Sequence, residues 1–209
     1  MTQQEIPLSP IATGLSGSIP TDALCRTWWE QCDMLDNIKQ HSQLVAEVAT
    51  TLAMLAVECG RGNTTDLPGA DFVQAVRAAG LLHDLGKTYT IVHGGNHSQI
   101  GAAWTMELTR NPAIAQGVMH HVYWPGQLDL NMHFLPLAII YADKRVRHDA
   151  LVCVEERFAD LMDRYGTNER SRGWIERSRR QNIELEHLLS IFLEEDIHAY
   201  PFDRRRLVG

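Results

Sequence analysis

The chain has 209 residues, of which 44% are hydrophobic, enough to bury the core of one domain. Its formal net charge of -7 gives no general attraction to nucleic acid or to an anionic membrane, so neither is expected as a partner. The sequence shows neither a charged-then-apolar leader nor an apolar run long enough to span a bilayer, and its four cysteines form no C-x-x-C pair. We therefore expect a cytoplasmic protein with reduced cysteines.

Residues 1–20 are rich in proline and glycine and are expected to form a flexible arm before a single domain, residues 21–209. Thr21 or Asp22 can cap a first helix that runs to about Leu35. Apolar residues recur at helical spacing in seven later segments. These predict helices that begin at His41, near Asp71 and at His97, and helices over residues 113–121, 134–146, 155–165 and 168–195.

The last predicted helix is long and heavily charged, and its mixed charges favour a solvated face. Two loops are expected near the ends of the helices, residues 88–96 and residues 122–131. The first carries His93, and the second carries Tyr123 and Trp124, whose rings suit the mouth of a pocket. Because no segment alternates apolar and polar residues as a strand does, the predicted fold class is all-α, a bundle of helices.

Histidines and aspartates lie near the ends of several of these helices. His83 and Asp84 are adjacent at the end of an apolar helical run, and Gly86 and Lys87 follow them. The other candidates are His41, His97, His120, His121 and Asp143. Imidazole nitrogen and carboxylate oxygen together suit Zn, Fe, Mn or Co better than calcium. A carboxylate such as Asp143 on an apolar stripe is costly unless it is paired or binds a metal.

The order of these residues resembles that of the HD superfamily of metal-dependent phosphohydrolases. His41, then His83-Asp84, then Asp143 follow the order of that family's motif, and the resemblance extends over about residues 35–165. The surrounding blocks are His41-Ser42-Gln43-Leu44-Val45-Ala46, His83-Asp84-Leu85-Gly86-Lys87, His97-Ser98-Gln99-Ile100-Gly101-Ala102 and Ala142-Asp143-Lys144.

The resemblance implies one or two divalent transition-metal ions, of Fe, Mn, Co, Ni or Zn. It makes His41, His83, Asp84 and Asp143 ligands of the first ion. His97, with His120 or His121, would complete a second site, with Asp84 as the bridge. We favour His121 over His120, because His121 continues the apolar stripe of its helix while the two side chains diverge by about 100°.

The implied activity is the hydrolysis of a small phosphate ester or nucleotide by a metal-activated hydroxide. Asp84 and Lys87 are then the candidate catalytic residues. Lys87 is also a candidate for binding phosphate, and so are Lys144 and Arg145. An oligomer is compatible with all of this.

Residues 120–126 (HHVYWPG) faintly resemble the HD-GYP cyclic-dinucleotide phosphodiesterases, but the Asp-Gly-x-Gly-Tyr-Pro signature of that group is absent, so its substrate is not carried over. Two alternatives stay open at this stage. One is an HD-type oxygenase with a mixed-valent di-iron site, and the other is a sensor module that binds metal or ligand without catalysis.

Overall fold

The computed structural model describes residues 17–61 and 69–202, and these residues confirm the all-α fold class. The expected arm lies mostly outside them, and so does the tail after Asp203. The helices are α1 Asp22–Gln31, α2 Asp36–Glu58, α3 Gly69–Leu82, α4 Lys87–His93, α5 His97–Thr109, α6 Pro112–His120, α7 Leu130–Lys144, α8 Val154–Tyr165 and α9 Glu169–Leu193. None of them is long and apolar enough to cross a membrane.

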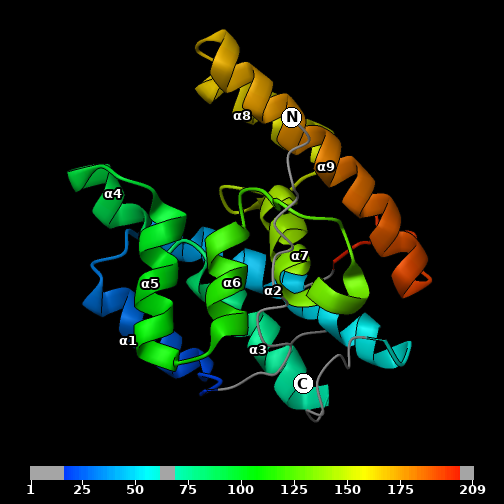
Figure 1. Ribbon diagram of the computed structural model, residues 1–209, viewed down its shortest axis with the longest axis horizontal. Coiled ribbons are helices and arrows are strands. Elements are labelled where there is room, and N and C mark those ends of the chain that lie inside the picture. Colours follow the sequence, from blue (N-terminus) through cyan, green and yellow to red (C-terminus); the bar gives the residue numbers. More distant parts are fainter. Residues whose placement is uncertain (1–16, 62–68, 203–209) are drawn as a thin grey trace, which may run out of the picture.

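The centre of the molecule is built from α2, α3 and α7, which lie side by side behind α5 and α6 (Figure 1). α2 and α3 approach closely at Gly80. A Cβ atom at this position would lie only 2.7 Å from the Cα of Ala46, so only glycine fits there. Almost every residue of α7 is buried, including the chain from Phe134 to Lys144. These three helices therefore fix the frame on which the candidate ligands sit.

Hydrogen-bonding side chains mark several helix starts where the sequence predicts them. Thr21 accepts a hydrogen bond from the backbone N–H of Leu24 and caps α1. Asn111 caps α6, with Pro112 in its first turn. Trp28 and Trp29 of α1 are both buried, and the indole N–H of Trp29 donates to the carbonyl oxygen of Leu81 at 2.8 Å. That bond ties α1 to the end of α3, directly beside the candidate site.

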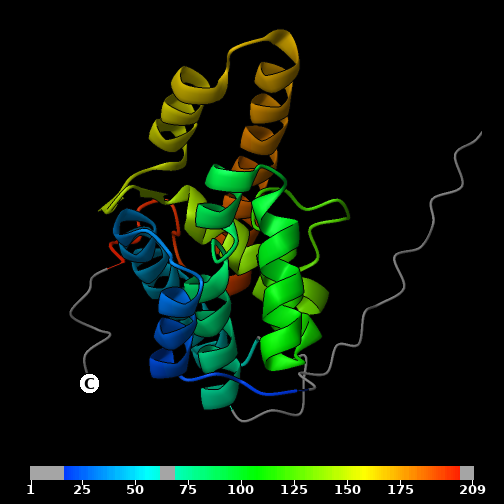
Figure 2. The same ribbon diagram turned by 90° about the vertical axis from the view of Figure 1, so that its left-hand side faces the viewer.

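α8 and the first half of α9 form a helical hairpin that rises from the body of the molecule (Figure 2). The second half of α9 packs on α7. Asn168 caps α9 through a reciprocal pair of hydrogen bonds with Ser171. The predicted helix over residues 168–195 is confirmed within two residues at each end.

Several predicted boundaries are wrong. The segment expected as a loop, residues 88–96, is mostly the helix α4, because Gly86 keeps a helical conformation and the chain continues into a new turn. α2 begins at Asp36, more than a turn before the predicted start at His41. The prediction missed this start because no side chain caps it. α1 ends at Gln31 rather than near Leu35.

A small strand pair also interrupts the helices. β1 Val146–Arg147 pairs antiparallel with β2 Ala150–Leu151. The sequence predicts a helix that reaches Val146, but α7 ends at Lys144 and Val146 begins β1. The turn between the two strands places His148, with a φ of 58°, against the end of the His41 ring.

Candidate metal centre

Six of the seven candidate metal ligands converge on one point in the middle of the bundle. They come from α2 (His41), the turn after α3 (His83 and Asp84), the start of α5 (His97), the end of α6 (His121) and the end of α7 (Asp143). Five of the six are buried, and His97 is partly exposed.

Backbone carbonyls fix the orientation of two of the histidines. The Nδ1 of His83 lies 2.7 Å from the carbonyl oxygen of Gly80, and the Nδ1 of His121 lies 2.7 Å from that of Val118. A carbonyl oxygen only accepts, so each Nδ1 carries a proton, and in the neutral ring each Nε2 presents its lone pair. The Nε2 of His83 is buried and has no hydrogen-bond partner among the described residues. A buried lone pair left in this way fits a metal ligand.

His41, His83 and Asp84 form the first cluster, and their ligand atoms all lie within 4.8 Å of one another. Asp143 joins them, with its Oδ1 at 3.0 Å from the Nε2 of His41 and 3.9 Å from that of His83. The Nδ1 of His41 faces the carbonyl oxygen of His148 at 3.3 Å. With the proton on that nitrogen, the lone pair of Nε2 faces a carboxylate oxygen, an arrangement that a cation between them would stabilise.

Asp84, His97 and His121 form the second cluster, again within 4.8 Å. The Oδ1 of Asp84 lies 3.5 Å from the Nε2 of His97 and 3.6 Å from that of His121, and it has no hydrogen-bond partner among the described residues. The two Nε2 atoms are 3.0 Å apart. Two donors bound to one ion at about 2.0–2.2 Å lie about 2.8–3.6 Å from each other, depending on the geometry. The spacing of the second cluster therefore fits a shared ion.

The charges of the site favour ionised carboxylates. Burial opposes ionisation of Asp84, but the imidazole of His83 and the ammonium of Lys87 hold the pKa of this carboxyl well below its usual range. Burial also opposes ionisation of Asp143, whose pKa is held well below its usual range by Lys144 and His41. Burial and the neighbouring His83 lower the pKa of His121 to about 3. Two carboxylates and a neutral imidazole are the forms that bind a divalent ion.

Two lysines contact these carboxylates. The Nζ of Lys87, at the first residue of α4, donates to the Oδ2 of Asp84 at 2.6 Å. The Nζ of Lys144 is paired with the Oδ2 of Asp143 and is buried. Lys87 is more open to solvent, with 37% of its side chain exposed. Both lysines line the cavity above the cluster.

The structure places three other candidates away from the cluster. His120 packs edge-on against Trp124, with ring centroids 5.2 Å apart. Arg145 is buried against the carbonyl oxygens of Val152 and Ile197, to which its guanidinium donates. Arg145 does not line the cavity that Lys87 and Lys144 share. His93 lies on the other side of α4, in a second pocket.

A cavity of about 540 Å³ opens above the metal cluster. Its floor is formed by Asp84, His97, His121 and Asp143, and its cations are Lys87, Lys144 and Arg157. The remaining wall is largely apolar and is provided mostly by the α8–α9 hairpin. The residues of this wall are Phe158, Leu161, Tyr165, Trp174 and Ile175, together with Tyr123 from the loop before α7.

Arg157 and the hairpin wall are absent from the sequence prediction. Arg157 lies on the buried face of α8, and its guanidinium donates to Asp160 at 2.9 Å while its Nε has no partner among the described residues. The strong amphipathic pattern of residues 154–165 was the available signal, because an arginine on an apolar face needs an anion. Of the two rings expected at the pocket mouth, Tyr123 lies there, whereas Trp124 is buried and donates to the carbonyl oxygen of Gln127.

Comparison with known proteins places this geometry in a family. The chain is 34% identical over 85 residues to Ribonuclease Y from two strains of Dehalococcoides mccartyi. The alignment covers 41% of this chain and 14% of each relative, so the chain spans only a small part of those proteins. No solved structure matches the chain significantly.

The family model of the HD domain matches residues 39–168. This range is more than half of the chain, and it contains His41, His83, Asp84 and Asp143 in the expected order. The chain belongs to the HD domain family.

Proposed function

We propose that this protein is a metal-dependent phosphohydrolase that acts on a small phosphate ester, with a nucleotide as the favoured substrate. The observation that carries the proposal is the position of Asp84. This buried carboxylate belongs to both histidine clusters, and it lies at the floor of a cavity that three cations line. Divalent metal ions held there would supply an activated water and would polarise the phosphate oxygens.

The side chains of the chain itself have separate tasks in this proposal. His41, His83 and Asp143, with Asp84, would hold a first ion, and His97 and His121, with Asp84, would hold a second. Lys87 and Lys144 offset the charge of the carboxylates and of the substrate's phosphate. Arg157, which also lines the cavity, has an Nε without a partner among the described residues and adds a third cation for the phosphate.

The apolar wall supports a substrate with a planar or apolar group beside its phosphate. Phe158, Tyr165 and Trp174 line the same cavity as the cations, and aromatic rings of this kind stack on nucleobases. A cavity of about 540 Å³ lies within the size range of small-molecule sites. Because one relative is named Ribonuclease Y, we include phosphodiesters of ribonucleotides among the proposed substrates.

The cations around the cavity favour this proposal over an oxygenase. An oxygenase needs a di-iron site, but it has no general need for Lys87, Lys144 and Arg157 around its substrate. A cavity with three cations instead suits an anionic group such as phosphate.

The test is a release assay on the purified protein after reconstitution with Fe, Mn, Co, Ni or Zn. We expect release of phosphate, or of nucleotide from short ribonucleotide diesters, with at least one metal, and loss of this activity in Asp84→Ala. The His120→Ala variant serves as a control, because His120 lies outside the cluster. Oxygen uptake by the iron-loaded protein without any hydrolysis would overturn the proposal in favour of an oxygenase. Tight nucleotide binding without turnover would support a sensor instead.

A further inference from the structure

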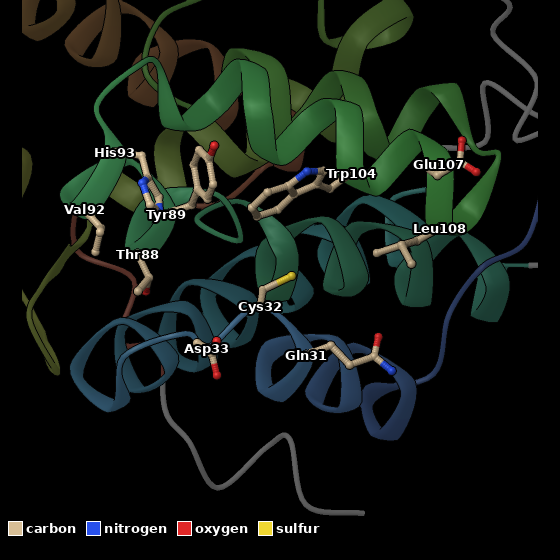
Figure 3. A pocket seen from close by; sticks show the side chains of 10 residues that line it. All are labelled: Gln31, Cys32, Asp33, Thr88, Tyr89, Val92, His93, Trp104, Glu107 and Leu108. Atoms are coloured by element: carbon tan, nitrogen blue, oxygen red, sulfur yellow. The ribbon is translucent and has the colours of Figure 1, made fainter.

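A second pocket of about 490 Å³ lies on the opposite side of α4 from the metal centre. Figure 3 shows the side chains that line it, which come from the end of α1 and from α4 and α5. None of them belongs to the metal cluster. They are Gln31, Cys32, Asp33, Thr88, Tyr89, Val92, His93, Trp104, Glu107 and Leu108.

Aromatic rings form one wall of this pocket. Tyr89 lies between His93, at a ring-centroid distance of 4.5 Å, and Trp104, at 5.5 Å and nearly perpendicular to it (Figure 3). Apolar side chains continue the wall and remain open to solvent, with Val92 70% exposed and Leu108 37% exposed. Exposed apolar and aromatic groups gathered in a hollow are typical of a binding site.

The charge of the pocket is negative. It contains two carboxylates, Asp33 and Glu107, and no lysine or arginine of the described residues lines it. Glu107 is paired with Arg110 at 2.8 Å. Asp33 forms no ion pair with any residue in the described part of the chain. The free charge of the pocket is therefore that of Asp33.

A tight turn after α1 holds Asp33. Asp33 follows the end of α1 and has a φ of 48°, a left-handed conformation that aspartate adopts more readily than most residues do. Its charge lies between the carboxyl end of α1, where the helix dipole favours cations, and the amino end of α2, where the dipole favours anions. Hydrogen bonds from the N–H groups of Asp33 and Met34 to carbonyls of α1 hold this turn in place. The turn therefore keeps Asp33 at a fixed position in the lining of the pocket.

We infer that this pocket binds a small organic ammonium ion. The faces of Trp104 and Tyr89 attract a cation through their negative π clouds, and the alkyl groups of such an ion contact Val92 and Leu108. The carboxylate of Asp33 balances the charge from the opposite wall. The concave shape and the volume suit a free small molecule rather than the flat contact of a protein partner.

α4 connects this pocket to the metal centre. Thr88, Tyr89, Val92 and His93 face the second pocket, whereas Lys87, Thr90 and Ile91 line the metal cavity. No residue of α4 is buried, so the core holds this short helix only loosely. A ligand that contacts Tyr89 and Trp104 joins α4 to α5, and it thereby restrains Lys87 on Asp84. The second pocket is thus an effector site that acts on the metal centre through α4.

The test uses choline as the probe and 3,3-dimethylbutan-1-ol as its neutral isostere, with binding followed by NMR of the full chain. We expect choline to bind about tenfold or more tightly than the alcohol. The largest shifts should be those of the indole N–H of Trp104 and of the backbone amides of residues 31–33 and 88–93. Asp33→Asn should weaken choline binding at least threefold, Trp104→Ala should abolish it, and Trp174→Ala, in the metal cavity, should leave it unchanged. Equal binding of the two probes, or wild-type binding by Asp33→Asn, would overturn the inference.

Coupling is tested with the same probe and without any substrate. Saturating choline should slow hydrogen exchange of the amides of α4, and it should change the dissociation constant of the bound metal in the wild type. Neither effect should occur in Trp104→Ala. A choline complex with unchanged exchange in α4 and unchanged metal affinity would show a binding site without the effector role. Both measurements are independent of phosphate release, so they do not depend on the proposed hydrolase activity.

Discussion

Asp84 has separate neighbours for its two carboxylate oxygens. Oδ1 faces His97 and His121, and Oδ2 faces His83 and Lys87. A carboxylate can serve two ions in this way, whereas an imidazole offers one lone pair to one ion. The position of Asp84 therefore predicts a site for two ions. Variants of the surrounding histidines can test how many ions bind.

His97→Ala should lower the metal content by about one ion per chain while leaving the first ion bound, the behaviour of a two-metal site. His97 is the partly exposed member of the second cluster, so its removal disturbs the core little. Elemental analysis after reconstitution measures the effect. The matched control is His120→Ala, which removes a neighbouring histidine that packs on Trp124 and should keep the full content. Equal metal content in wild type and His97→Ala would contradict the binuclear assignment.

Lys87→Ala should retain both ions but reduce turnover by about a hundredfold, the effect of losing one preorganised charged donor at a developing negative charge. The reason is that Lys87 contacts Asp84 from the open side of the cavity. Steady-state kinetics on the best substrate of the screen, together with metal analysis, would check this. If the variant lost its metal instead, Lys87 would be a structural partner of Asp84 rather than a contact of the substrate.

At the scale of helices, close approach between α2 and α3 sets the position of the first cluster. Gly80→Ala would place a Cβ about 2.7 Å from the backbone of Ala46, so we expect a loss of about 1–3 kcal/mol in the free energy of unfolding. Gly173, in the second turn of α9, has no other described side chain or neighbouring helix within 4 Å of the same position. Gly173→Ala should therefore stabilise the protein by about 0.5–1 kcal/mol. Urea unfolding of both variants measures the contrast, and equal stabilities would show that the helix contact is not tight.

The same scale shows what the sequence could predict. The apolar period of α3 and of α6 places His83 and His121 at the ends of buried faces, and a helical pattern is sufficient for that. It does not show that Gly80 and Val118 would provide the carbonyls that orient their rings. The fold class and most helices follow from periodicity, since each stripe is a property of one segment.

Contacts between segments are harder to predict. The pair Gly94-Gly95 predicts a loop over residues 88–96, but the glycines only end the helix α4, which takes up residues 87–93. The role of the α8–α9 hairpin could not be read from residues 154–193, because their pattern gives a buried face but not the surface that it covers. The hairpin rises from the body of the molecule (Figure 2), and Arg157 and Trp174 line the cavity only in the folded chain.

At the scale of the whole molecule, the candidate ligands come from elements spread between α2 and α7. They lie together only in the folded chain, so metal binds the folded state and stabilises it through linkage. An ion present at a hundred times its dissociation constant contributes about 2.7 kcal/mol. For a chain of this size, each kcal/mol corresponds to about 2–4 °C in the melting temperature.

Removal of the metal with a chelator should therefore lower the melting temperature of the whole protein, by about 5–11 °C for a single ion at that concentration. The transition should stay a single one, because α2 and α7, which carry His41 and Asp143, share one hydrophobic core. Differential scanning calorimetry of the metal-loaded protein, before and after chelation, measures the change. Asp84→Ala provides the control, since a variant that lacks the shared ligand should melt at the same temperature with and without chelator. An identical melting temperature for the loaded and chelated wild type would show that the clusters are a polar core rather than a metal centre.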